Sequence, residues 1–423
     1  MIKKLLILIV ILTSLVTKAQ EKPPLVIQNG DASPYSFFGI GTLNFRGTAE
    51  NRTMGGLSIL SDSIHTNLSN PAAYADLKLV NYTIGFNHKE LSLKTKSQSE
   101  STSVTGLNYL AISIPMGKFG AGFGLLPVTS VGYALESKAD EVTRRNTGEG
   151  GLNKVFLALG YNLFKGFNIG IDASYNFGKI TNRALRIDEG VQFDTQELNE
   201  SDLVGFSFNF GAMYKTMISS QLQFSSAISY SPSTDLSSKN TRALQTVDFV
   251  NFGSIRVTNS IDVDVPDTDI TFPSQLSVGF GIGKPRNWFV GAEFVNKQIS
   301  GNNRSLDLFN LSENVVFDDI TMYKLGGYYI PKYDSFSNYW SRVTYRAGIR
   351  FENLGMTINN EEINEFGISF GVGLPVRNFS NVNIGFEIGR RGTKNAGLVE
   401  ETFFGGFISL SLNSKWFKKT LFD

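Results

Sequence analysis

The sequence predicts an all-β protein, a 14-stranded antiparallel transmembrane β-barrel. Two patterns predict this fold: apolar and polar side chains alternate in segment after segment, and the links between segments alternate between short and long. Residues 167–177 show the first pattern, because every odd position is apolar and every even position is small or polar. Successive side chains of a strand point to opposite faces, so each segment has one apolar and one polar face. Repeated about fourteen times, this alternation is typical of a barrel in lipid.

The N-terminus indicates export. Lys3 and Lys4 precede an apolar stretch over residues 5–16, which is too short to span a membrane. Residues 17–19 then offer a small-residue cleavage site, so we expect a signal peptide over residues 1–19. An uncleaved N-terminal anchor helix is the alternative interpretation.

The composition excludes several classes of protein. The absence of cysteine rules out a lipoprotein anchor, disulfides and thiolate metal sites, and we expect no metal or cofactor. No later apolar run reaches about 18 residues, the length of a transmembrane helix. A net charge of +1 without a basic stripe argues against nucleic acid as a partner. The 42 glycines and 34 phenylalanines suit a curved wall whose outer face meets lipid.

The chain divides into four regions. Residues 20–34 form a polar lead-in, and residues 35–78 are rich in Gly, Ser and Asn and lack the alternation, which predicts compact irregular structure. The barrel wall is expected over residues 79–413, and residues 414–423 form a basic, aromatic periplasmic tail. The expected strands are 79–93, 104–115, 119–135, 151–164, 167–180, 203–216, 219–231, 270–283, 287–299, 320–330, 341–353, 363–374, 381–390 and 403–413. Twelve or sixteen strands would also fit the pattern.

The links agree with this topology. Those after the even strands are mostly short, and those after the odd strands are mostly longer and more charged, with the longest over residues 232–269. Barrels with short periplasmic turns and long outer loops show this alternation. Residues 331–340 break the rule with a long aromatic periplasmic link. Residues 242–250 and 255–265 also alternate and predict a hairpin in the longest outer loop.

Three short motifs precede the first strand in a fixed order: Gly39-Ile40-Gly41, then Met54-Gly55-Gly56, then Asn70-Pro71-Ala72. With the barrel pattern, this order resembles the long-chain fatty acid transporter (FadL) family of outer-membrane proteins. The resemblance implies that the N-terminal segment folds inside the lumen as a hatch, with Gly55, Gly56, Asn70, Pro71 and Ala72 as its characteristic residues. From the residues alone, Asn70-Pro71 could also be an ordinary turn.

The resemblance also implies a lateral opening at the third strand, which the family kinks inward. The corresponding stretch here holds Gly120, Gly122, Gly124 and Pro127. Proline cannot donate a ladder hydrogen bond, and alternate glycines leave the backbone free to bend. In the alternative interpretation these glycines make room for the hatch and Pro127 lies above the membrane.

Charged residues at polar-face positions are expected to point into the lumen, because an arginine facing lipid costs roughly 2–4 kcal/mol. These positions are Asp172, Glu293, Arg346, Arg350, Glu352 and Glu387. Arg346 or Arg350 could hold an anionic head group such as a fatty-acid carboxylate. Alternatively, and more in keeping with the nearby acids, an Arg–Glu network could attach the hatch to the wall.

Catalysis is not expected. A barrel hydrolase needs a Ser/His or Asp/His constellation. The two histidines, His65 in the expected hatch and His88 on the first strand, lie in no nucleophile motif. Glycine pairs such as Gly279-x-Gly281 lie within strands and precede no helix, so they are not nucleotide loops.

The sequence therefore predicts a passive transporter of the Gram-negative outer membrane. A hydrophobic, fatty-acid-like molecule would leave a hatch-plugged barrel sideways into outer-membrane lipid. The alternative is a FadL-like partner subunit that joins other outer-membrane proteins in a secretion or barrel-assembly complex. Long polar outer loops, the aromatic link at 331–340 and the basic tail favour this alternative. A porin for hydrophilic solutes is a third interpretation, disfavoured by the hatch.

Overall fold

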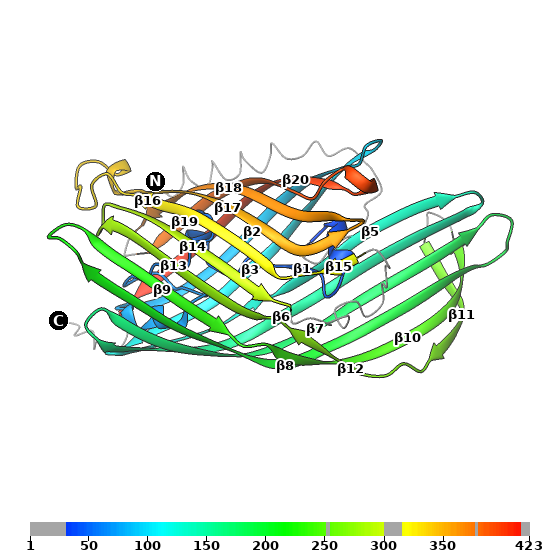
Figure 1. The fold of residues 1–423 in the computed structure, drawn as a ribbon, viewed down its shortest axis with the longest axis horizontal. Helices are drawn as coiled ribbons and strands as arrows, with labels where there is room; N and C mark the ends of the chain where they lie inside the picture. The colour runs from blue at the N-terminus through cyan, green and yellow to red at the C-terminus, as the bar shows by residue number, and fades with distance from the viewer. Residues whose placement is uncertain (1–30, 251–253, 300–314, 377–379, 416–423) are drawn as a thin grey trace, which may run out of the picture.

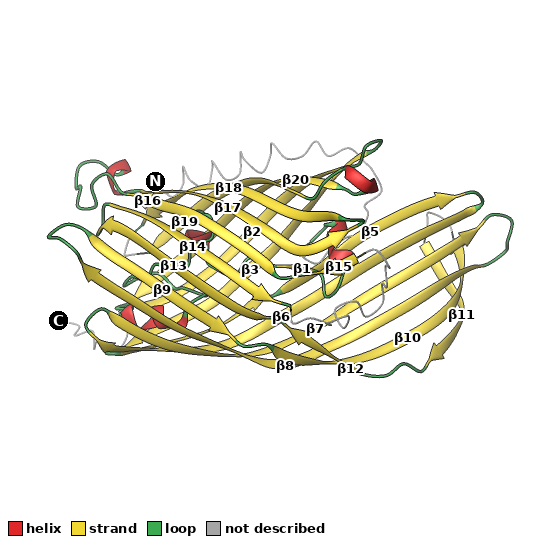
Figure 2. Ribbon diagram, in the orientation of Figure 1, coloured by secondary structure: helices red, strands yellow, loops and turns green. Residues whose placement is uncertain are grey.

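The wall closes where its first and last strands pair. β2 (Val80–Lys94) runs antiparallel to β20 (Glu400–Ser414) along its whole length, from the pair Val80–Ser414 to the pair Lys94–Glu400 (Figures 1 and 2). The computed structural model describes residues 31–250, 254–299, 315–376 and 380–415. The expected signal peptide at 1–19, residues 20–30 and most of the expected tail lie outside this range.

The described residues form fourteen antiparallel wall strands, which confirms the predicted fold class. Four of these strands are divided into two or three pieces. In chain order, the strands between β2 and β20 are β3 (Ser99–Met116), β4 with β5 (Phe119–Pro127, Thr129–Ala139), β6 (Val142–Phe164), β7 (Phe167–Asp188), β8 (Asp194–Met217), β9 with β10 (Gln223–Ser231, Thr234–Val250), β11 with β12 and β13 (Ser254–Val263, Thr268–Phe272, Ser274–Lys284), β14 (Trp288–Gln298), β15 with β16 (Val315–Phe317, Ile320–Tyr329), β17 (Thr344–Ile358), β18 (Glu361–Pro375) and β19 (Asn381–Arg391).

The wall is apolar outside and polar inside. On β7, Ile169 and Ile171 are exposed on the outer face, whereas Asp172 and Asn176 are buried in the lumen. The neighbouring strand agrees, because Phe210 of β8 is exposed opposite Ile171. An apolar outer band around a polar interior is the arrangement of an outer-membrane barrel.

Part of the wall is much taller than a membrane. β6, β7 and β8 contain 23, 22 and 24 residues, whereas about 9–11 residues suffice for a tilted membrane strand. Beyond the apolar band, Lys179 and Arg183 of β7 pair with Glu200 and Glu149. The outer halves of β6, β7 and β8 therefore continue outside the lipid and, with β10 and β11, form what we call the outer blade, at the right of Figure 1.

The outer links differ from the expectation in two places. Residues 232–269, expected as the longest loop, form mostly strand, although the predicted hairpin is confirmed by the pairing of β10 with β11. The alternation there marks a continuation of the wall. The link between β17 and β18 was expected to be longer and is a two-residue turn, Asn359-Asn360, with φ of 51° and 65°. Asparagine tolerates this left-handed conformation, which two-residue hairpins require.

Residues 31–78 lie inside the ring of strands. They contain η1 (Pro34–Phe37), β1 (Thr42–Leu43), α2 (Ala49–Arg52) and η2 (Pro71–Asp76). Two further short helices, η5 (Trp340–Arg342) and η7 (Asn395–Gly397), lie in links between strands. Across the described ranges, no helix has the length and apolar character needed to cross a membrane.

The lipid-facing side can be tested with Phe208, which is exposed on β8. We expect Phe208→Arg to reduce the free energy of unfolding by roughly 2–4 kcal/mol, because a guanidinium must enter the hydrocarbon. Urea titration of the barrel in lipid vesicles, followed by heat-modifiable gel mobility, measures this change. Ser137→Arg at an exposed tip of β5 is the control; an equal loss in both variants would contradict the assigned membrane band.

Candidate functional site

The Asn-Pro-Ala motif begins the helix η2 and joins it to the wall. The Asn70 side chain accepts a hydrogen bond from the Ala72 amide at 3.0 Å and donates one to the Ile228 carbonyl of β9 at 3.0 Å. Pro71 occupies the first turn of the helix, where its missing N–H costs nothing. A Cβ added to Gly170 of β7 would lie 2.4 Å from the Pro71 carbonyl carbon. The motif therefore packs so closely against β7 that position 170 must be glycine.

The other hatch motif shows the same close approach on the opposite wall. Gly55 has a φ of 68°, and a Cβ there would lie 2.6 Å from the Ile349 carbonyl oxygen of β17. Its amide donates to the Ser369 hydroxyl of β18 at 3.0 Å. Gly56 follows with a φ of 88° and packs against Phe45. Both glycines therefore hold backbone geometry that a larger residue would strain.

Two buried ion pairs and a hydrogen bond connect the hatch to three sides of the wall. Arg46 of the hatch pairs with Asp172 of β7 at 2.9 Å, and Arg52 pairs with Glu387 of β19 at 2.9 Å. Ser58 donates from its amide to Glu293 of β14 at 2.6 Å. All three wall carboxylates are buried. A buried charge is tolerated only when it is paired and hydrogen-bonded, so the hatch supplies partners that the wall needs.

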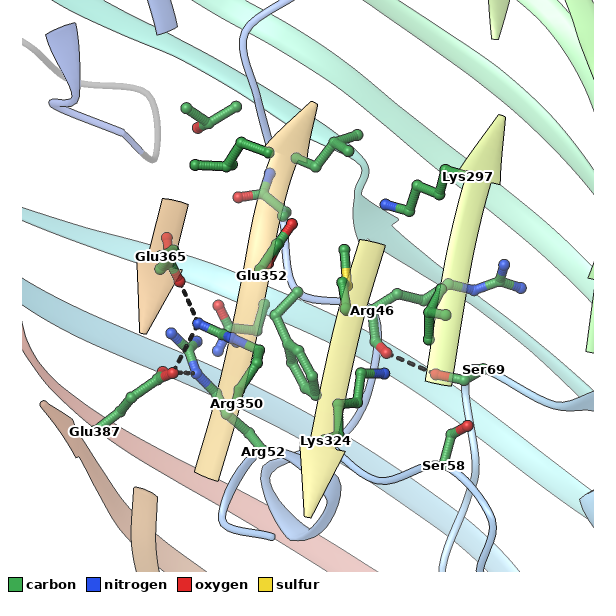
Figure 3. Close-up of a pocket in the computed structure, with 18 of the residues that line it drawn as sticks. Arg46, Arg52, Ser58, Ser69, Lys297, Lys324, Arg350, Glu352, Glu365 and Glu387 are labelled. Atoms are coloured by element: carbon green, nitrogen blue, oxygen red, sulfur yellow. Dashed lines mark hydrogen bonds and ion pairs between the residues drawn. The ribbon is translucent and has the colours of Figure 1, made fainter. Parts of the chain in front are cut away.

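Two arginines of the wall strands themselves extend this network of ion pairs. Arg350 of β17 pairs with Glu387 at 2.9 Å and also with Glu365 of β18 (Figure 3). Arg391 of β19 pairs with Glu365 at 2.6 Å and with Glu401 at 3.6 Å. The Arg350 guanidinium is thus already occupied by two carboxylates.

The charged chamber shown in Figure 3 lies between these groups, with a volume of about 140 Å³. Lys297, Lys324, Glu352 and the ion pairs just described line it. Its volume is below the roughly 300–1,000 Å³ of a small-molecule site, and its lining is charged rather than apolar. The chamber therefore does not provide an apolar resting place for a ligand.

The glycines predicted for the lateral opening lie on β4, which pairs with β3 on one side and with β6 on the other. A Cβ on Gly120 would lie 1.9 Å from the Tyr74 carbonyl oxygen, and one on Gly122 would lie 2.0 Å from the Tyr74 ring. One on Gly124 would lie 2.3 Å from the Leu110 carbonyl oxygen of β3. The first two glycines thus make room for the hatch.

An unpaired stretch of wall begins at the end of β4. β3 pairs with β4 only over Leu110–Met116, and β5 pairs with β6 and with β1 of the hatch but not with β3. A cavity of about 420 Å³ lies at this gap. Pro127 lines it, together with residues absent from the prediction: Asn44, Asn87, Thr105, Leu107, Asn108, Thr129, Ser130, Asn153 and Lys179. The gap is lined mainly by polar groups. No pattern in the sequence indicates it, because its four asparagines come from four different segments.

A larger cavity, which we call the vestibule, opens at the end of the barrel with the short turns, the periplasmic end in this class of barrel. Its volume is about 730 Å³. Hatch residues 60–67 form one side of it. Residues 283–286, 375–376 and 380–381, the link between β16 and β17 and the start of β17 also line it. Arg346 lines the vestibule, where it donates to Asn383 at 3.0 Å and is 8% exposed. Arg346 and Arg350, predicted together as head-group ligands, thus face different cavities.

Neither histidine forms a hydrogen bond with a serine among the described residues. His65 binds Asp62 at 2.5 Å, and His88 contacts the Thr105 hydroxyl at 2.7 Å. Burial disfavours the charged form of His65, but the Asp62 carboxylate outweighs it and raises the pKa of His65 above its ordinary value. Within the described ranges, no three His, Asp or Glu side chains are grouped to bind a metal.

These features define an outer-membrane β-barrel that is filled by its own N-terminal segment, with the fold of the FadL family. A sequence model of the family described as BamG matches residues 1–423, so the chain belongs to the BamG family. No curated protein matches the sequence.

Solved barrels with this fold differ strongly in sequence. The toluene transporter TodX of Pseudomonas putida is 15% identical, with a TM-score of 0.59, covering 88% of this chain and 99% of its own. The toluene transporter TbuX of Ralstonia pickettii is 13% identical, with a TM-score of 0.58, covering 88% and 100%. A FadL homologue of Pseudomonas aeruginosa is 11% identical, with a TM-score of 0.54, covering 88% and 98%.

Glu387 tests the attachment of the hatch. We expect Glu387→Gln to destabilise the barrel by about 3–5 kcal/mol, because Arg52 loses its carboxylate while it stays largely buried. Urea titration measures the loss, and conductance in planar bilayers reports whether the hatch loosens. Glu189→Gln removes the exposed partner of Lys138 and should change neither quantity. A stable, closed Glu387→Gln barrel would contradict the attachment.

Proposed function

We propose that this barrel is a non-transporting subunit of an outer-membrane complex for secretion or barrel assembly. The observation that carries the proposal is the attachment of the hatch, whose arginines are ion-paired to buried wall carboxylates on two sides. An apolar ligand that crossed the lumen would have to part these charges in a low dielectric. Breaking even one buried pair costs several kcal/mol, and an apolar ligand offers no compensating partner.

The character of the openings supports the same role. The gap between β3 and β5 exposes side-chain amides and hydroxyls, whose water an apolar molecule would displace without replacing the hydrogen bonds. At the periplasmic end, Phe336 and Trp340 are strongly exposed on the link between β16 and β17. Exposed aromatic side chains are typical of protein interfaces. Membership of the BamG family fits this role, because FadL-like barrels include accessory members of barrel-assembly machines. We expect no catalytic activity.

Passive transport of a hydrophobic molecule is the second candidate. It is favoured by the fold shared with barrels named as toluene transporters and by the gap between β3 and β5. In this candidate the ligand would enter from outside and leave sideways near Pro127 into the outer leaflet.

Native mass spectrometry of the protein purified from its own membranes in mild detergent separates the two. We expect a stoichiometric complex with other outer-membrane proteins and no apolar adduct. A single chain that carries a fatty acid or hydrocarbon would contradict the subunit role and favour transport. Cells that lack the protein should take up a labelled fatty acid at the normal rate, and a selective loss of uptake would also contradict the proposal.

Removing the hatch tests the seal itself. Deletion of residues 35–78 should make cells permeable to a small hydrophilic dye, because the lumen loses its filling while the wall can still close through β2 and β20. The folded state of the variant is checked by heat-modifiable mobility. A folded but dye-tight barrel would show that the hatch is not what closes it.

A further inference from the structure

The lining of the vestibule contains more cationic than acidic side chains. Arg286, Arg342 and Arg346 line it, and no carboxylate of the described residues lies within ion-pair distance of any of them. The two acids of the lining form no ion pair with these arginines: Asp62 binds His65, and Glu50 accepts hydrogen bonds from Asn383 and Ser411 through one of its two carboxylate oxygens. This differs from the charged chamber, where Arg350 has two carboxylate partners.

Two of the arginines are held in place without full satisfaction. Arg346 is more than nine-tenths buried, and its side chain makes a single hydrogen bond to the described residues, to Asn383. The Nε atom of Arg342 is buried and has no hydrogen-bond partner in the part of the chain that the structure describes. A buried guanidinium N–H without a hydrogen-bond acceptor costs free energy, and a ligand that brings an acceptor would recover this cost. Carboxylates are the natural acceptors, because they match the guanidinium fork.

Aromatic surfaces stand beside the arginines. Arg286 lies over the Tyr333 ring at 5.2 Å, and Arg342 lies over the Tyr339 ring at 5.5 Å. Deeper in the vestibule, Phe289 and Tyr328 stack with their ring centroids 6.0 Å apart. Leu60 and Met54 of the hatch add apolar surface. The vestibule thus combines cationic and apolar contacts, and its volume of about 730 Å³ holds several side chains.

We propose that the vestibule binds an extended acidic and aromatic segment of a periplasmic partner protein, with the partner's carboxylates on Arg342 and Arg346 and its aromatic side chains against Tyr328 and Tyr333. The arginines come from a strand turn, from η5 and from β17. Cations spread over three elements suit a chain of carboxylates better than one small anion. This inference rests on the proposed subunit role and names the kind of partner that the role requires.

The test measures peptide binding to the full-length protein in detergent, by fluorescence anisotropy. The probe is a labelled decapeptide of alternating Glu and Phe, and its comparators alternate Lys with Phe and Glu with Ser. We expect the Glu-Phe peptide to bind at least tenfold more tightly than either comparator. Arg342→Gln and Arg346→Gln should each weaken its binding about tenfold, which corresponds to one lost charge-assisted hydrogen bond.

Arg183→Gln is the matched control, because it removes an arginine of the outer blade that pairs with Glu149 far from the vestibule. It should leave binding unchanged. Arg342 lies on a link outside the strands, so its variant reports on binding even if Arg346→Gln folds poorly. Equal binding of the Lys-Phe peptide, or unchanged binding by a folded Arg342→Gln protein, would overturn the proposal.

Oleate is added as a competitor. Displacement of the Glu-Phe peptide by micromolar oleate would assign the vestibule to a fatty-acid anion and would also overturn the proposal. Failure of peptide binding together with an intact native complex would reject only the vestibule site. Failure of the complex in native mass spectrometry would instead reject the subunit role.

Discussion

The requirement that backbone polar groups find partners governs this molecule. A strand edge in lipid would leave N–H and C=O groups unpaired, so the wall closes through β2 and β20. The wall is interrupted beside β5, and there the hatch supplies partners: Thr42 pairs with Ser130, and the Asn44 amide donates to the Val128 carbonyl. The hatch is therefore part of the sheet as well as its filling, which explains why the wall can afford an interruption at Pro127.

Charged side chains are also excluded from lipid, so they point into the lumen. There they need partners of opposite charge, and these pairs attach the hatch to the wall. Asp172, Glu293 and Glu387 are buried on three wall strands, and the hatch contributes Arg46, Ser58 and Arg52 to them. Neither part satisfies its charges alone. We infer that hatch and wall stabilise each other, and that a ligand route through the lumen would be opposed by the interactions that stabilise the barrel.

Periodicity revealed the wall but not the cavities. The alternation over residues 167–177 predicted correctly which side chains of β7 face lipid, because that outcome depends on the strand alone. The inward placement of Asp172 and Glu387 followed from the same rule. The asparagines at the gap and the arginines of the vestibule could not be grouped in this way, because strand register and hatch path bring them together. The outer blade was missed because a strand outside lipid loses its apolar face and resembles a loop in composition.

The height of the outer blade has a consequence for access. The tall strands β6, β7 and β8 stand together on one side, whereas β18, β19 and β20 contain 15, 11 and 15 residues. The outer rim of the barrel is consequently slanted: it is high at β6, β7 and β8 and low at β2, β19 and β20 (Figure 1). A large molecule that approaches from the cell exterior would be blocked by the outer blade on one side and would meet only the short strands on the other side. Approach along the membrane plane over the low strands is therefore easier than approach over the outer blade. The two sides of the barrel thus differ in their accessibility from outside the cell.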